Sequence, residues 1–227
     1  MVLTIHHLGV SQSERLLWLC EELGVKYELK TYKRAPLLAP PEYKALHPAG
    51  TSPVIQDDGG GDKLVTLAES SACVEYVSHK HGGGQLFLGP SHPQYADFLY
   101  WFHFANGTFM PALSRAMAAS PPGAGSGGPM AGMAQERFVK GLAALNSRLR
   151  DNEWLAGGAE FTAADIMAVF PLTTMRFFTP YSLAEHPNIV KYLERVGQRP
   201  AYQRAMKIGD PDMQPLLAAE PPAKGSK

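Results

Sequence analysis

The chain has 227 residues, of which 45% are hydrophobic and 19% charged, a composition typical of a soluble globular protein with one or two domains. Its 21 basic and 21 acidic residues cancel, which argues against a nucleic-acid-binding protein because such proteins usually carry a basic surplus. No apolar run reaches the ~20 residues that cross a membrane, and two cysteines make no disulfide framework, so we expect a cytoplasmic protein without a membrane span.

The first elements predicted are a strand, a helix and a second strand. Residues 2–8 are apolar and β-branched, as in a strand. Ser11 and Glu14 have the spacing of a capping box, and apolar residues at helical spacing follow as far as Gly24, a natural helix stop. Residues 26–31 alternate polar and apolar side chains. This order favours two parallel strands joined by a right-handed crossover.

A proline-rich segment with a hairpin and another helix follows. The segment holds one short helix at 41–46. Strands at 53–56 and 63–67 flank a glycine-rich turn and predict the hairpin. A helix over 70–81 completes the order βαβαββα.

The rest of the chain shows only helical patterns. We expect helices at 93–113 and 134–152, separated by a loop or break at 120–132 that is rich in glycine and proline. A further helix opens with a capping box between Thr162 and Asp165. Two short helices begin at first-turn prolines, Pro187 and Pro200.

These patterns predict two domains. The boundaries are drawn at glycine and proline clusters and where strand patterns end. They give a mixed α/β domain at 1–83, a linker at 84–92, an all-helical domain at 93–212 and a flexible tail at 213–227.

Ser11 and Ser13 lie between the first strand and the first helix. A hydroxyl at a helix N-terminus sits at the positive end of the helix dipole, where it can stabilise a thiolate. The alternative is that both serines only cap the helix.

Two more segments carry groups suited to a peptide ligand. Pro53 opens a strand and is a candidate for a cis bond, which would leave the backbone of Ser52 free to pair with an extended peptide; an ordinary trans proline is the alternative. Glu69 and Ser70 precede a helix whose first N–H groups can bind a carboxylate, while Glu69 can pair with an ammonium group. Together they suit an α-amino-acid headgroup, although a plain helix cap also fits.

Other site types lack their sequence signals. The chain has no Cys-x-x-Cys motif, its eight histidines lack the spacing of zinc ligands, and its glycine-rich stretches lack the lysine of a phosphate loop. We therefore expect neither a dithiol redox site nor a metal.

In this order, the segments resemble the glutathione transferase superfamily. The similarity runs from about residue 2 to residue 207. Within the superfamily, the chain most resembles a serine-type group with fungal and bacterial members. The motifs that carry it are Ser11-x-x-x-Arg15, His47-Pro48-x-Gly50-x-Ser52-Pro53, Leu67-Ala68-Glu69-Ser70 and Phe161-Thr162-x-Ala164-Asp165.

The resemblance implies an α+β fold with a thioredoxin-like N-terminal domain, a cis Pro53 and an all-α C-terminal domain, usually as a homodimer. It also implies glutathione as co-substrate, with its cysteine backbone paired to Ser52 and its γ-glutamyl group at Glu69 and Ser70. The expected glutathione-binding residues are Ser11, His47, Thr51, Ser52, Pro53, Glu69 and Ser70.

The activity implied is transfer of glutathione to a hydrophobic electrophile, as in detoxification. Ser11 is the first candidate for activating the thiol, Ser13 the second and His7 the third. Further candidates are Lys44, Arg34 and His47 for the glycine carboxylate, and Phe102, Phe109 and Met110 for the electrophile. A glutathione-dependent peroxidase or isomerase, and a non-catalytic binding module, are the alternatives.

Overall fold

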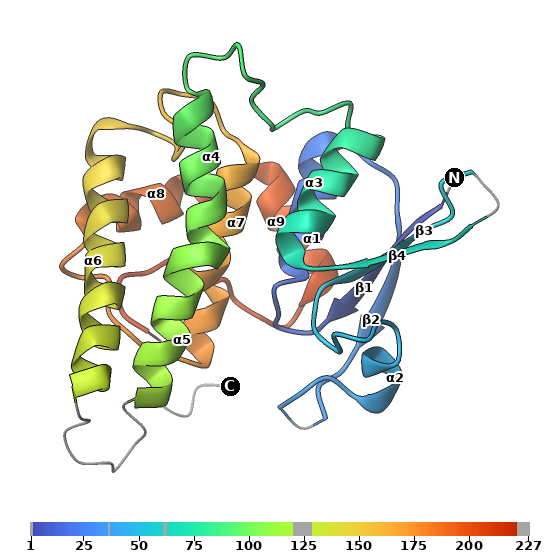
Figure 1. The fold of residues 1–227 in the computed structure, drawn as a ribbon, viewed down its shortest axis with the longest axis horizontal. Helices are drawn as coiled ribbons and strands as arrows, with labels where there is room; N and C mark the ends of the chain where they lie inside the picture. The colour runs from blue at the N-terminus through green and yellow to red at the C-terminus, as the bar shows by residue number, and fades with distance from the viewer. Residues whose placement is uncertain (1, 36, 61–62, 120–128, 222–227) are drawn as a thin grey trace. The chain divides into compact units, whose positions relative to one another are not determined.

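The computed structural model describes residues 2–35, 37–60, 63–119 and 129–221 (Figure 1). Its internal contacts divide the chain into two compact units. The sheet unit comprises Met1–Phe87 and Val196–Pro215, and the helical unit comprises Leu88–Arg195 and Leu216–Lys227. The contiguous division drawn from the sequence placed 196–212 with the helices, whereas the contacts place that segment in the sheet unit.

A four-stranded sheet in the order β2-β1-β3-β4 forms the centre of the sheet unit. β1 pairs in parallel with β2 and antiparallel with β3, and β3 pairs antiparallel with β4. Ile5 in β1 lies opposite Leu29 and Ile55 and is fully buried. The predicted parallel pair and hairpin are therefore confirmed. The strands are β1 (Leu3–Leu8), β2 (Glu28–Tyr32), β3 (Val54–Asp57) and β4 (Val65–Ala68).

The helices between these strands complete the predicted βαβαββα order. α1 ends where Gly24 adopts a left-handed φ of 64°, a conformation that glycine takes at little cost. The helices are α1 (Glu14–Leu23), α2 (Pro41–Lys44), α3 (Ser70–His81) and α9 (Pro200–Gly209).

Two predicted caps are wrong in detail. No side-chain cap hydrogen bond is found at α1, which begins at Glu14, because the Ser11 and Ser13 hydroxyls bond to each other at 2.8 Å. Ser70 is the first residue of α3 and not its cap, since Glu69 occupies the preceding position with a φ of 72°. In both places, the serine hydroxyls that the sequence suggested as helix caps do not cap the helix.

α9 packs against α1 within the sheet unit. The Trp18 and Tyr202 rings meet edge to face, with centroids 4.9 Å apart. Arg199 forms a bidentate pair with Glu22, with N–O distances of 2.7 and 2.8 Å. These contacts explain why the segment after Val196 belongs with the sheet.

The helical unit contains no strand among its described residues. The predicted helix at 93–113 extends to Ala119 and contains a π-helical turn, and the helix predicted at 134–152 starts at Pro129. Residues 129–132 of the predicted break are therefore helical, and its residues 120–128 lie outside the described part. The elements are α4 (Tyr95–Phe104), the π turn (Ala105–Phe109), α5 (Met110–Ala119), α6 (Pro129–Asp151), α7 (Ala163–Leu172), a 3₁₀ turn (Thr174–Phe177) and α8 (Pro187–Gly197).

The capping box of α7 is present as predicted. The fully buried Asp165 carboxylate accepts hydrogen bonds from the N–H and hydroxyl of Thr162, from the Leu155 N–H and from the Tyr192 hydroxyl. Four donors offset much of the cost of burying this carboxyl group. Among the described helices, none has the length and apolarity to span a membrane.

The segment 216–220 contacts the helical unit, whereas the sequence assigns it to a flexible tail. Arg176 is fully buried and donates to the carbonyl oxygens of Ala218 and Ala219. The Leu183 N–H also donates to Ala219, at 2.8 Å. A buried guanidinium needs such acceptors because it cannot give up its charge. Residues 222–227 lie outside the described part.

Candidate functional site

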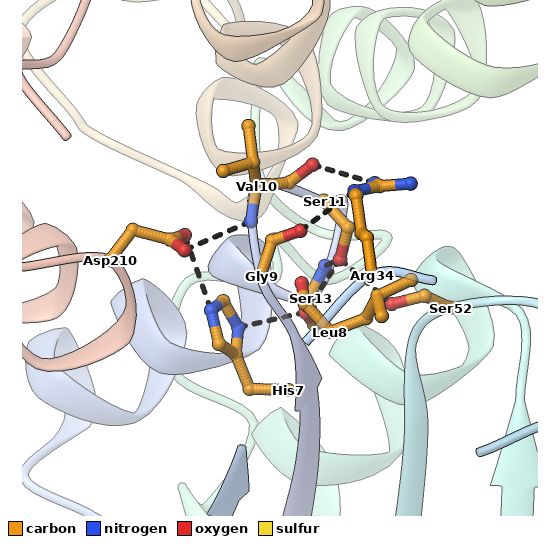
Figure 2. Close-up of polar contacts among 9 residues, drawn as sticks. All are labelled: His7, Leu8, Gly9, Val10, Ser11, Ser13, Arg34, Ser52 and Asp210. Carbon is orange, nitrogen blue, oxygen red and sulfur yellow. Dashed lines mark hydrogen bonds and ion pairs between the residues drawn. The ribbon is translucent and has the colours of Figure 1, made fainter. Parts of the chain in front are cut away.

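The loop from β1 to α1 brings three serine hydroxyls together (Figure 2). The Ser11 Oγ lies 2.8 Å from the Ser13 Oγ and 2.9 Å from the Ser52 Oγ. Ser11 and Ser13 are buried, whereas Ser52 is half-buried. The Ser52–Pro53 peptide bond is cis, as predicted. The two candidate hydroxyls and the predicted peptide-binding residue therefore form one cluster.

A histidine and a carboxylate extend this cluster inward. The Nδ1 of His7 lies 2.8 Å from the Ser13 Oγ. On the other side of the ring, Nε2 lies 3.2 Å from the Oδ2 of Asp210, an ion-pair distance without hydrogen-bond alignment. The Oδ1 of Asp210 accepts a hydrogen bond from the Val10 N–H at 2.9 Å. Sequence reasoning ranked His7 third and missed Asp210.

Arg34 holds the loop that leads to Ser11, and Figure 2 shows its guanidinium directed at the carbonyl oxygens of Gly9 and Val10. It donates to the carbonyl oxygens of Gly9 at 2.9 Å, Val10 at 2.7 Å and Leu37. Burial lowers the pKa of Arg34, and the negative charge of Asp210 opposes this shift. Its donors point to backbone oxygens, so the structure gives Arg34 a role in shaping the loop.

Ser70 connects the start of α3 to the start of α1. Its hydroxyl accepts from Arg15 Nη1 at 2.9 Å and donates to Gln12 Oε1 at 3.4 Å. Burial lowers the pKa of Arg15 to about 9, against the opposing charge of Glu14. Glu69 is exposed beside this network. Its positive φ is uncommon for a residue other than glycine, and such strain collects at functional sites.

The remaining predicted glutathione residues lie on the loop before β3. Thr51 is exposed, Pro53 is buried, and His47 is half-buried. The His47 Nδ1 accepts from the Ala49 N–H at 3.1 Å. Thr51 and Pro53 flank Ser52 in the chain. The hydrogen bond of the His47 ring is to a backbone N–H of the same loop.

The environment of both cysteines disfavours the thiolate form. Cys20 and Cys73 are fully buried. Burial raises the pKa of the Cys73 thiol to about 12 and that of Cys20 further. Since the thiolate is the reactive form, the chemistry of this site rests on hydroxyls and the imidazole.

The predicted electrophile residues are only partly available. Phe109 is buried between Phe104 and Phe138 with ring centroids 6.0 and 5.7 Å away, and Phe102 is also buried. Both belong to the core of the helical unit. Met110 is half-buried.

Comparison with known proteins gives matches over most of the chain. Residues 11–80 match the glutathione S-transferase N-terminal domain, and residues 111–195 match the glutathione S-transferase C-terminal domain. Glutathione S-transferase 3 of Schizosaccharomyces pombe is 32% identical, over 92% of this chain and 89% of the relative.

Solved structures of glutathione transferases are also similar to this chain. A glutathione S-transferase from Actinobacillus pleuropneumoniae superposes with a TM-score of 0.79 at 31% identity, covering 92% of this chain and 93% of that one. A glutathione transferase from Phanerochaete chrysosporium in complex with oxidized glutathione shares the fold, with a TM-score of 0.72 at 21% identity over 91% and 95% of the two chains. The chain therefore belongs to the glutathione S-transferase family.

Proposed function

We propose that this protein transfers the thiolate of glutathione to hydrophobic electrophiles, with Ser11 as the hydroxyl that stabilises the thiolate. The observation that carries the proposal is the cluster of Ser11, Ser13 and Ser52 beside the cis bond. Family membership supports the reaction, and the Phanerochaete relative of the same fold contains oxidized glutathione.

In this proposal glutathione lies along the loop before β3 and the start of α3. Its cysteine backbone pairs with the backbone of Ser52, next to Thr51 and Pro53. Its γ-glutamyl group contacts the exposed Glu69 and the Ser70 hydroxyl at the N-terminal end of α3. The position of His47 on the same loop supports a contact with the glycine end of the peptide.

The reaction needs a thiolate at neutral pH. A free cysteine thiol titrates near ~8.5, and a hydrogen bond to the charged form lowers this value. In the proposed step the Ser11 hydroxyl donates to the sulfur while the start of α1 adds the positive end of its dipole. The sulfur then forms a bond to the electrophilic carbon, and the bond to the leaving group breaks.

Ser11→Ala tests this role. We expect glutathione affinity to be retained and turnover of a chloronitrobenzene to fall about 10- to 100-fold, because a hydrogen bond to a charged group is worth about 1.5–3 kcal/mol. Calorimetric binding and initial rates measure the two effects. Ser147→Ala, at an exposed serine of α6, is the control and should leave both unchanged. Full turnover by Ser11→Ala would contradict the assignment of Ser11.

Detoxification in the cytoplasm as a homodimer is part of the same proposal. Family membership supports the assembly, and so does Tyr100 of α4, a large aromatic side chain left 56% exposed. Large exposed apolar groups gather at protein interfaces. Light scattering on the intact chain measures its mass, and a monomer at micromolar concentration would contradict the dimer.

A further inference from the structure

The hydrogen-bonded chain that begins at Ser52 and Ser11 continues into the interior of the sheet unit. His7 and Asp210 form its inner end, and none of the proposed glutathione contacts uses them. The His7 side chain is 0% exposed and that of Asp210 10% exposed. Burial of a histidine and a carboxylate is costly unless the two groups are hydrogen-bonded or paired.

The surroundings of His7 leave it few partners. Ser13 faces Nδ1 and Asp210, at the end of α9, faces Nε2. Gly209 and Leu17 lie beside the ring as well: a Cβ on Gly209 would lie 3.1 Å from His7 Cε1 and 2.7 Å from Leu17 Cδ1. Glycine at 209 therefore lets the end of α9 approach the imidazole. Arg34 is the further charge that acts on Asp210.

The contacts assign the protons of the neutral ring. Nε2 faces a carboxylate, so it carries the hydrogen, and Nδ1 is left as an acceptor. The Ser13 hydroxyl reaches two acceptors, Nδ1 at 2.8 Å and the Leu8 carbonyl oxygen at 3.3 Å, and the relay uses the shorter contact, with Ser11 donating to Ser13. In this state the Ser11 oxygen accepts from the Ser13 N–H at 3.3 Å, and its second lone pair, on the side of Ser52 at 2.9 Å, is the one that can accept the thiol proton.

We propose that His7 accepts the proton of the glutathione thiol through Ser13 and Ser11, and that Asp210 stabilises the imidazolium that results. This inference rests on the proposed function. The S–H bond breaks and its proton passes to the Ser11 oxygen. Ser11 passes its own proton to Ser13, and Ser13 passes its proton to His7 Nδ1. One proton moves from sulfur to nitrogen, and Ser11 then donates to the thiolate.

Two features of the inner end fit this role. His7 Nε2 and Asp210 Oδ2 are buried without an aligned hydrogen-bond partner among the described residues, although they are 3.2 Å apart. A positive charge on the ring converts this contact into an ion pair. The Val10 N–H holds the other oxygen of Asp210 in place, so the carboxylate is already oriented for the charged ring.

His7→Asn tests the relay, because an amide can accept the Ser13 hydrogen bond but cannot take up the proton. The ultraviolet absorbance of the thiolate reports ionisation of bound glutathione as the pH is varied. We expect the pH of half-ionisation to rise by about one unit, a tenfold change in proton affinity. We also expect turnover of a chloronitrobenzene to fall about 100-fold, the lower end for general base catalysis.

S-methylglutathione separates this effect from damage to the binding site. It has no thiol proton, so His7→Asn should bind it as tightly as the wild type does. His6→Asn is the matched control, since His6 is a buried neighbour that contacts Tyr32 and Gln56 and lies outside the relay. It should leave the thiol titration unchanged.

Asp210→Asn provides a second variant should His7→Asn not fold. It keeps an oxygen for the Val10 N–H and removes the charge, so the titration should shift in the same direction. Thiol titrations of the folded variants that match the wild type would overturn the relay while leaving the transferase proposal intact. A wild-type protein that binds no S-methylglutathione would instead contradict the proposed function itself.

Discussion

Arg34 determines the shape of the loop that carries Ser11. Its guanidinium donates to carbonyl oxygens on both sides, at Gly9 and Val10 before the serine and at Leu37 in its own loop. A planar group with five donors suits this task better than the ammonium of lysine. The position of Ser11 relative to Ser52 therefore depends on a residue that the sequence suggested for ligand binding.

Arg34→Ala should destabilise the protein by about 1–3 kcal/mol, because it leaves carbonyl oxygens of a half-buried loop without their charged donor. For a chain of this size, this lowers the melting temperature by about 2–12 °C. Differential scanning calorimetry measures the change. Lys33→Ala is the matched control, since Lys33 is exposed and such changes stay within about 0.5 kcal/mol. Equal melting temperatures for the two variants would contradict the role of Arg34.

At the residue scale, the sequence predicted some members of the hydrogen-bonded cluster and missed others. Ser11, Ser13 and the cis Pro53 were predicted because each belongs to a short motif. Asp210 was missed because an acid after a helix has no periodic or motif signal, and its partner Val10 lies 200 residues earlier. Local patterns do not encode contacts at such separations.

At the scale of elements, two helix starts with the same polar spacing behave differently. Thr162 and Asp165 form their capping box at α7, whereas Ser11 and Glu14 do not form one at α1. The two helix starts differ in the other hydrogen-bond partners that lie within reach of the capping hydroxyl. The Ser11 hydroxyl finds Ser13 and Ser52, so a helix pattern that is locally sound gives way to a tertiary hydrogen-bond network.

The capping box of α7 makes stability depend on pH. Burial raises the pKa of Asp165 to about 6, although its four hydrogen bonds act in the opposite direction. The ordinary value of 3.8 applies to the unfolded chain, so folding favours the protonated acid. The stability that this group contributes is therefore complete below pH ~4 and is lost as the pH rises through ~6.

Asp165→Asn cannot titrate and isolates this contribution. The stability of the wild type relative to Asp165→Asn should be about 1 kcal/mol greater at pH 5 than at pH 7.5. Urea unfolding at the two pH values measures this difference. A difference of the opposite sign would show that the hydrogen bonds to the carboxylate outweigh its burial.

At the scale of the whole molecule, the order of the chain and its packing do not coincide. The sheet unit takes α9 from the far end of the chain, with Arg199 bound to Glu22 and Tyr202 against Trp18. The sequence predicted a helix from Pro200 but assigned it to its neighbours in sequence. A helical pattern identifies an apolar face but not the surface that covers it.

Residues 1–87 alone should therefore fail to unfold cooperatively, because the face of α1 that α9 covers becomes exposed. Circular dichroism during heating measures this. Joining residues 196–215 through a flexible linker of about 20 glycine and serine residues, with a reach of ~25 Å, should restore a cooperative transition. A sharp transition in the 1–87 fragment would contradict the structural role of α9.

The contact between Asp210 and Val10 also has a consequence for biosynthesis. Domains generally fold as units, from the N-terminal end first, while the ribosome is still adding residues. Here the β1–α1 loop must wait for residue 210 before its Val10 N–H finds this carboxylate. The nascent chain can therefore carry all three serines well before the inner end of its site exists, and thiol activation through the proposed relay starts only when translation has passed Asp210.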